Sequence, residues 1–446
     1  MTAADVRVPR ARLIVILAAL VVCSALLWLT RSFTFYFDEW TFITTAPDWT
    51  VATYFQPHNE HPSILFRLIY SALLHSVGLR SYLPYMALLL IAHGANVVLL
   101  FELVRRRAGN LIGVAAAALL LVLGAGWEDL LWAFQVAWLA SVAFGLAALL
   151  VLDRRPALAA LLVLDRRPAL AAGFLGVSLM FSAIGLFFAV AAAVQLALAP
   201  DRRRDLRWLA PVAVVLAAWY VAFGRFANHP NPQPTATNLL LDPVYALWGL
   251  SQSAAGVIGE GGWVGLPLLV LAVVAVAWRW RRHGADAFAI GVATGLVAFY
   301  LVTGLTRAQL GVQQSGASRY VYVAAVLWLI LLADAARGLP WRGTWRPALV
   351  ALLFLACFNS AALLFSFVAA RTVLMAWEQA DYAALSAERG DPCLNGAGGV
   401  DPLVMPFVTP AQYYRAVDYF GDPATLPITD RAAFAAALAR IRKASC

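Results

Sequence analysis

The chain has 446 residues, of which 62% are hydrophobic and only 13% are charged, and its mean hydropathy is +0.76. Soluble domains carry about 25% charged residues, so this composition excludes an ordinary soluble protein and predicts an all-α polytopic membrane protein. The net charge of +9 comes almost entirely from arginines that cluster between apolar runs, which is typical of short cytoplasmic loops and argues against a nucleic-acid partner.

The first apolar run, from Leu13 to Leu29, follows Arg7, Arg10 and Arg12. A secretory signal peptide has a similar order of charged and apolar residues, but this run is long and no small-x-small cleavage site follows it. We therefore predict an uncleaved first membrane span whose N-terminus lies in the cytoplasm.

Apolar runs and arginine clusters together predict about eleven membrane spans. A span needs about 20 mostly apolar residues, and the chain must cross the membrane an even number of times between two cytoplasmic clusters. The clusters are Arg105 to Arg107, Arg154 with Arg155, Arg166 with Arg167, Arg202 to Arg204, Arg279 with Arg281 and Arg282, and Arg337 to Arg346. The predicted spans are residues 13–30, 83–104, 110–125, 133–152, two short spans within 169–199 that turn near "SAIG", 206–224, 263–278, 286–304, 320–336 and 347–369. The odd count places the long loops 31–82 and 225–262 and the tail 371–446 outside the cytoplasm.

A tandem repeat lies between the fourth and fifth predicted spans. The segment "ALLVLDRRPALA" occupies residues 148–159 and recurs without change at 160–171. Twelve helical residues cover only about 18 Å, so the two charged turns cannot lie on opposite faces of a membrane. We interpret the repeat as a local duplication at the cytoplasmic surface and not as a solenoid, which needs several units.

The four cysteines show no metal-ligand spacing. Cys23 and Cys357 lie in apolar runs, where packing is the expected role. Cys393 and Cys446 lie in the tail, and they could form a disulfide if the tail faces an oxidising compartment.

The first outside loop holds two polar clusters. Asp38 and Glu39, in "FDEW", come directly after the first span, where carboxylates are functional candidates. His58, Glu60 and His61 follow in "QPHNEHPSILFRLIY", just before a run of apolar residues at helical spacing. This run predicts an amphipathic surface helix with the histidine and glutamate cluster at its N-terminus.

Two further clusters lie at the same predicted face. Glu128 and Asp129 stand between tryptophans in "GWEDLLWAFQ", and Arg319 lies at the outer end of the tenth span in "SRYVYVAA", with Arg307 and Arg225 as possible additions. Carboxylates can act as general bases or hold Mg²⁺ or Mn²⁺, and arginine suits a phosphate group. The sequence does not decide whether a divalent cation is used.

The motifs "FDEW", "HNEHPSILFRLIY", "GWEDLLWAFQ" and "SRYVYVAA", in this order and topology, resemble uncharacterised bacterial members of the GT-C superfamily. These are polytopic glycosyltransferases that use polyprenyl-phosphate sugars. The resemblance covers about residues 10 to 370. It implies a transmembrane domain 1–370 with surface helices in its outside loops, a small extracytoplasmic tail 371–446, and a place in the bacterial inner membrane.

The resemblance also implies a mechanism. A carboxylate takes a proton from the acceptor hydroxyl, the acceptor attacks the anomeric carbon with inversion, and the polyprenyl phosphate leaves. The acceptor is a glycan, a lipid or a protein. In this reading Asp38 is the base, with Glu39 as the alternative. The residues implied to position the acceptor or a metal are Glu128, Asp129, His58, Glu60 and His61, and those implied to bind the donor phosphate are Arg319 and Arg307, with His58 or His61 as further candidates.

Two other functions fit parts of the same pattern. A transporter or flippase of a lipid-linked sugar also needs outward-facing carboxylates and arginines, but it usually has repeat symmetry and polar residues at midspan, which this sequence lacks. A non-catalytic anchoring protein has no reason to bring the polar clusters together. The discriminating observation is whether these clusters share one cavity.

Overall fold

The computed structural model describes residues 2–153, 167–226, 234–395, 398–424 and 431–445, and these residues form α- and 3-10 helices without a β-strand. Eight of the described helical segments are long and apolar enough to cross a membrane. They contain α1 (Ala11–Leu29), α5 (Leu83–Ala108), α8 (Val136–Leu152), α11 (Ala210–Ala222), α13 (Gly265–His283), α14 (Ala287–Arg307), α15 (Ser318–Ala336) and α16 (Trp345–Ala387). The prediction of an all-α, polytopic membrane protein is confirmed at this level.

Three shorter apolar helices correspond to the remaining predicted spans. They are α6 (Asn110–Leu121), α9 (Arg167–Phe181) and α10 (Gly185–Leu198). The chain turns between α9 and α10 at residues 182–184, in the "SAIG" segment. Since twelve helical residues cover only about 18 Å and the hydrocarbon core is about 30 Å thick, the count of eleven spans stays a prediction.

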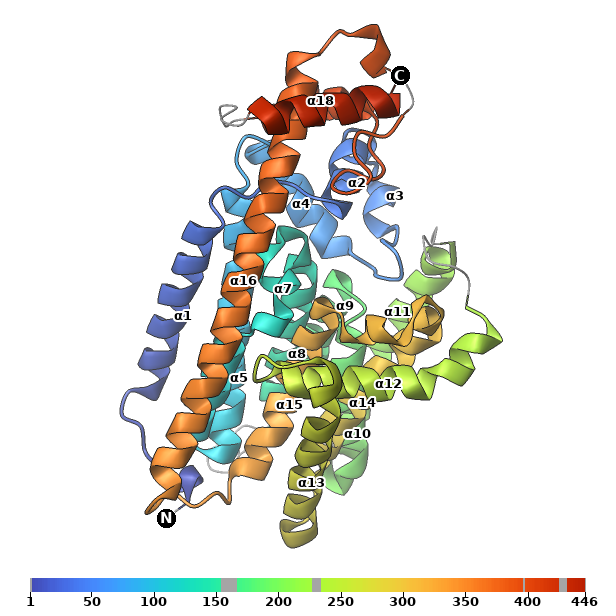
Figure 1. The fold of residues 1–446 in the computed structure, drawn as a ribbon. Helices are drawn as coiled ribbons and strands as arrows, with labels where there is room; N and C mark the ends of the chain where they lie inside the picture. Colours follow the sequence, from blue (N-terminus) through green and yellow to red (C-terminus); the bar gives the residue numbers. More distant parts are fainter. Residues whose placement is uncertain (1, 154–166, 227–233, 396–397, 425–430, 446) are drawn as a thin grey trace.

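The two ends of the chain lie at opposite ends of the molecule (Figure 1). We call the end that holds the N-terminus the lower end and the end that holds the C-terminus the upper end. The helix α16 has 43 residues, about 65 Å at 1.5 Å per residue, which is twice the hydrocarbon thickness. It passes through the predicted boundary at residue 370 because no helix-breaking residue follows that point until after Ala387.

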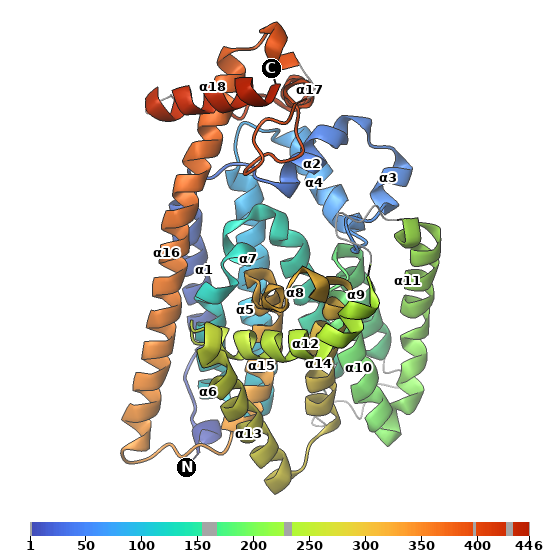
Figure 2. The same ribbon diagram turned by 45° about the vertical axis from the view of Figure 1, so that its right-hand side comes forward.

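The upper end consists of the first loop and a cap formed by the C-terminal residues (Figure 2). The loop contains α2 (Asp38–Thr45), α3 (Val51–Phe55) and α4 (Ile64–Ser76), and the cap contains the end of α16, α17 (Pro410–Phe420) and α18 (Arg431–Ser445). Backbone hydrogen bonds join the two parts, from the Phe37 N–H to the Val404 carbonyl (2.9 Å) and from the Leu79 N–H to the Phe420 carbonyl (2.9 Å). The cap therefore fixes the loop that carries Asp38.

The helix α12 (Ala236–Gly256) lies in the predicted second outside loop and runs across the bundle (Figures 1 and 2). Its last six residues, Ser251 to Gly256, are buried, as is Tyr245 near its middle. The close approach of Gly249 to the ring of Tyr300 on α14 leaves no room for a Cβ atom. The predicted second outside loop thus contains a helix that packs against its neighbours.

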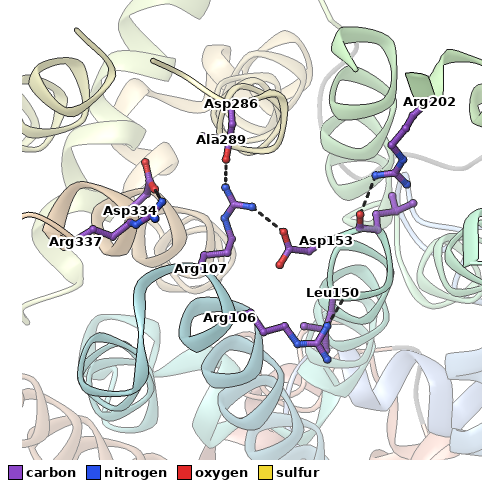
Figure 3. A network of polar contacts seen from close by, with 10 residues as sticks. Arg106, Arg107, Leu150, Asp153, Arg202, Asp286, Ala289, Asp334 and Arg337 are labelled. Atoms are coloured by element: carbon purple, nitrogen blue, oxygen red, sulfur yellow. Dashed lines mark hydrogen bonds and ion pairs between the residues drawn. The ribbon is translucent and has the colours of Figure 1, made fainter. Parts of the chain in front are cut away.

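Arginines from several of the predicted cytoplasmic clusters meet in one network at the lower end (Figure 3). Arg107 lies between Asp153, at 2.7 Å, and Asp286. Arg202 donates to the Leu152 carbonyl (2.9 Å), and Arg106 donates to the Leu150 carbonyl (3.3 Å). These arginines therefore tie helix ends together. The tandem repeat cannot be placed in this network, because residues 154–166 lie outside the described part of the chain.

Candidate functional site

A cavity of about 360 Å³ lies at the upper end, where the first loop meets α8, α14, α15, α16 and the short helix α7 (Glu128–Leu131). Its lining comes from segments that are far apart in the sequence. Six of the residues singled out from the sequence line it, namely Asp38, His58, His61, Glu128, Arg307 and Arg319. The polar residues of the first outside loop and of the "GWEDLLWAFQ" segment therefore share one cavity with the arginine of the tenth span.

Asp38 begins α2 directly after Phe37, whose backbone has φ 53° and ψ −115°. Such a conformation is rare for a residue with a side chain and costs about 1–3 kcal/mol; here the hydrogen bond from Phe37 to Val404 holds it. The Asp38 side chain is 28% exposed. Burial raises the pKa of Asp38 to about 6, although the charge of Arg319 opposes the increase. A carboxylate with a pKa near neutrality is well suited to general-base catalysis.

Both histidines of the cavity are neutral at pH 7. Burial lowers the pKa of His58 to about 3 and that of His61 to about 4. His58 Nε2 lies 4.0 Å from Asp38 Oδ2. His61 Nδ1 accepts a hydrogen bond from the backbone N–H of Ala183 (3.2 Å). Because Nδ1 is the acceptor, the proton of neutral His61 sits on Nε2, which makes that atom a hydrogen-bond donor.

Two of the cavity arginines already have carboxylate partners. The Arg319 guanidinium lies 3.5 Å from Glu128, whose carboxylate also accepts from the Arg319 backbone N–H (3.2 Å). The Arg307 guanidinium lies 2.7 Å from Glu60. Burial raises the pKa of Glu60, but the nearby charge of Arg307, together with His61 and the hydrogen bonds to the carboxylate, outweighs this effect, and the net shift is downward. Glu128 and Glu60 are therefore ion-paired with arginines in this structure, and the acceptor- or metal-positioning role that the resemblance implied for them stays a prediction.

Glu39 does not line the cavity, and its side chain is fully buried. Its carboxylate accepts hydrogen bonds from the Tyr82 hydroxyl (2.9 Å), the Tyr70 hydroxyl (3.0 Å), the Trp132 indole (3.2 Å) and the Tyr36 N–H (2.9 Å). Burial raises the pKa of Glu39 to about 8, although these hydrogen bonds oppose the increase. Successive residues of a helix point about 100° apart, so Glu39 faces inward when Asp38 faces the cavity. The expected catalytic role of Glu39 is not supported. Its hydrogen bonds instead join α2 to the segments that carry Tyr70, Tyr82 and Trp132.

Asp129 and Arg225 also lie away from the cavity lining. Asp129 is fully buried, neither of its oxygens has a hydrogen-bond partner among the described residues, and burial raises its pKa well above the usual range. It therefore lies inside the bundle, and the acceptor- or metal-positioning role that the resemblance implied for it stays a prediction. Arg225 is exposed and stacks on Phe226.

One charged residue of the cavity lining was not anticipated from the sequence. Arg371 lies on α16, is only 6% exposed, and stacks on Tyr36 with its guanidinium carbon 4.0 Å from the ring centre. Its Nε has no hydrogen-bond partner, and no described residue forms an ion pair with it. The available signal was an arginine immediately after the last predicted span, in "FVAARTV". Assigning that residue to a separate tail obscured it.

An apolar groove of about 400 Å³ begins beside the cavity. It runs between α9 and α11, and Pro62 and Ile64 form part of its lining, so it starts one residue after His61. A Cβ atom added at Gly173 or Gly176, both in the groove, would meet no other atom within 4 Å. The groove is thus open, apolar and next to a charged cavity.

Among the described residues, no group of three or more His, Cys, Asp and Glu side chains could hold a metal ion. The use of a divalent cation stays a prediction that the sequence left open, and the mechanism below uses only protein side chains. The side chain of Cys393 and residue 446 lie outside the described part of the chain, which leaves their pairing a prediction. Comparison of the chain with protein-family models, with curated proteins and with solved structures gives no match.

Proposed function

We propose that this chain is an integral membrane glycosyltransferase of the GT-C type, with about eleven spans, in a bacterial cell membrane. It moves a sugar from a polyprenyl-phosphate donor to a hydroxyl of a glycan, lipid or protein acceptor. The observation that carries the proposal is the position of Asp38 in a cavity that also holds arginines and adjoins an apolar groove. The arginine clusters of the lower end favour a cytoplasmic position for that end, and the proposal therefore puts the cavity outside the cytoplasm.

Asp38 is the general base of the proposed reaction. It takes the proton of the acceptor hydroxyl, whose oxygen forms a bond to the anomeric carbon. The bond from that carbon to the phosphate oxygen breaks, and the electron pair leaves with the polyprenyl phosphate. Attack from the face opposite the phosphate inverts the anomeric centre. The positive charge of the cavity arginines and the His61 Nε2–H stabilise the negative charge that builds on the leaving phosphate.

The groove supports a lipid-linked donor. Its lining is almost entirely apolar, with Leu, Val, Ala, Gly and Trp side chains, so a prenyl chain gains about 25 cal/mol for each Å² of apolar surface that it buries. Since the groove starts beside His61, a chain lying in it would present its phosphate to the cavity. A soluble nucleotide-sugar donor gives no reason for such a groove.

The substitution Asp38→Asn tests the base role. The amide keeps the shape of the side chain but cannot take up a proton, so we expect transfer to fall by about 100-fold or more while lipid-phosphate binding remains. Asp48→Asn is the matched control, because Asp48 lies in the same loop but is exposed and paired with Arg415. Full transfer activity in Asp38→Asn, with purified protein and labelled donor, would exclude Asp38 as the base.

The same cavity and groove also fit a lipid-linked sugar in transit, so a flippase is the second candidate. Reconstitution in sealed vesicles separates the two functions. Covalent transfer of sugar to an added acceptor on one side supports the enzyme. Movement of intact lipid-linked sugar between leaflets, without any transfer, supports the flippase.

A further inference from the structure

We propose that Arg371 binds the phosphoryl anion of the lipid-linked substrate, and that Arg319 and Arg307 instead hold the cavity walls. This assignment rests on the proposed function for the lipid part of the ligand. The ligand chemistry that it names is a phosphate carried by an apolar chain. The geometry of α16 and the charges of the cavity lead to it independently.

The first argument is the position of Arg371 on its helix. The buried residues of α16 recur every three or four positions, which is the pattern of a helix with one packed face. They are Ser360, Leu364, Val368, Arg371, Met375, Glu378, Asp381, Tyr382, Ala384 and Leu385. Arg371 thus stands on a buried stripe, at a point where the stripe faces the cavity. A helix that only needed to pack would carry an apolar side chain there.

The second argument is the balance of charge. Arginine stays charged in proteins, and burying a charge without a partner is costly. Glu128 compensates Arg319, and Glu60 compensates Arg307. With both histidines neutral, Asp38 and Arg371 remain as the two charged lining groups without an ion pair to a charged described residue. A phosphate bound to Arg371 gives this guanidinium the direct anionic partner that it lacks among the described residues.

The third argument is the presentation of the guanidinium. Tyr36 stacks on Arg371 at 4.0 Å, and the Trp127 ring centre lies at 5.8 Å. Stacking stabilises the cation and fixes its plane, while Nε remains without a hydrogen-bond partner. A guanidinium held in this way offers parallel N–H groups that match two phosphate oxygens.

A fourth observation links this group to the proposed base. Glu378 lies seven residues after Arg371 on the same face of α16, and it accepts a hydrogen bond from the Trp40 indole (2.9 Å). Trp40 lies two residues after Asp38 on α2. The helix α16 therefore carries Arg371 and also holds α2, the helix that begins with Asp38. This contact sets the distance between Arg371 and Asp38.

The test is a binding measurement that does not require catalysis. Full-length protein in nanodiscs is titrated with polyprenyl phosphate, with the neutral polyprenol and with inorganic phosphate. We expect wild-type protein to prefer polyprenyl phosphate over polyprenol, and Arg371→Met to weaken phosphate binding roughly tenfold or more without affecting polyprenol. Arg371→Lys retains part of the preference. Arg31→Gln is the matched control, since Arg31 also stacks on an aromatic ring, that of Trp28, but is exposed and lies outside the cavity lining.

Thermal unfolding separates binding from structure. Because methionine fits an apolar stripe and removes a buried charge, we expect the Tm of Arg371→Met to equal or exceed that of wild type. The assignment is overturned if Arg371→Met still prefers polyprenyl phosphate over polyprenol as strongly as wild type does. It is also overturned if Arg319→Met loses this preference and Arg371→Met does not. If inorganic phosphate binds as tightly as polyprenyl phosphate, the claim that the ligand is a lipid-linked phosphate is overturned. Loss of transfer in Asp38→Asn together with normal binding in Arg371→Met retains the proposed function and rejects only this inference.

Discussion

The two ends of the molecule use the same residue types in opposite ways. At the lower end, Arg107 lies between two aspartates, and its neighbours reach backbone carbonyls (Figure 3). At the upper end, two arginines are paired with glutamates, but Arg371 and Asp38 have no ionic partner in the described residues. Charged side chains that have an ionic partner stabilise helix packing. Charged side chains without an ionic partner beside a cavity reduce stability and remain available to a ligand. The difference separates structural from functional polar groups better than the presence of charge does.

The largest effect that follows from this contrast is on stability at the lower end. Arg107→Gln leaves Asp153 buried without its cation, so we expect the free energy of unfolding to fall by about 3 kcal/mol. Ligand preference in the remaining folded protein should not change. Arg204→Gln is the control, because Arg204 is an exposed arginine at the same end. A stability loss at Arg371 as large as that at Arg107 would remove the contrast.

The second prediction concerns the pH dependence of transfer. Asp38 acts as a base only when it is ionised, and its pKa is raised to about 6. Activity should therefore be full above pH 7 and fall about tenfold for each pH unit below 6. The histidines do not contribute in this range, since their pKa values are lowered to about 3 and 4. Values of kcat/KM that stay constant between pH 5 and 8 would contradict the assignment.

The third prediction concerns the groove. Gly176→Leu places a side chain in open space, so it fills the groove without a clash, and it replaces glycine in a helix by a better helix former, worth about 0.5–1 kcal/mol. We expect equal or higher stability together with a roughly tenfold rise in KM for the lipid donor, the loss of about 1.4 kcal/mol of binding. Gly338→Leu, at an exposed and equally open site, is the control. Unaltered KM in Gly176→Leu would place the lipid elsewhere.

The smallest expected effect concerns the coupling between the cap and the cavity. Trp40→Phe removes the hydrogen bond to Glu378, which should reduce stability by about 1 kcal/mol. Because Asp38 lies on the same short helix, kcat should decrease a few-fold while the affinity for polyprenyl phosphate holds. Trp28→Phe, at an exposed site on α1, provides the comparison. Equal kcat values in Trp40→Phe and Trp28→Phe would contradict a coupling between the cap and the cavity.

The sequence predicted the elements of the site well but not their orientation. The spans followed from apolar runs, and the loop motifs with Asp38, His58 and Glu128 do line one cavity. Whether Asp38 or Glu39 faces that cavity depends on helix rotation, which an adjacent acidic pair does not reveal. The pairing of Arg319 and Arg307 with glutamates depends on contacts across 191 and 247 residues. Such contacts leave no local pattern in the sequence.

The role of α16 was the main feature that could not be predicted. Hydropathy marks where a helix leaves the apolar layer, at about residue 369, but the helix continues to Ala387 as an amphipathic segment. A boundary drawn from hydropathy therefore separated Arg371 from the domain to which it contributes. The C-terminal cap is part of the site because it holds the strained Phe37 backbone and the indole of Trp40.

The most direct test of the account is a cryo-electron microscopy structure of the full-length protein with polyprenyl phosphate bound. We predict that the phosphate lies within hydrogen-bonding distance of the Arg371 guanidinium, on the side of the cavity that faces Asp38, with the prenyl chain in the groove between α9 and α11. A phosphate bound by Arg319 or Arg307 after displacement of their glutamates, or a lipid at the lower end, would contradict the account.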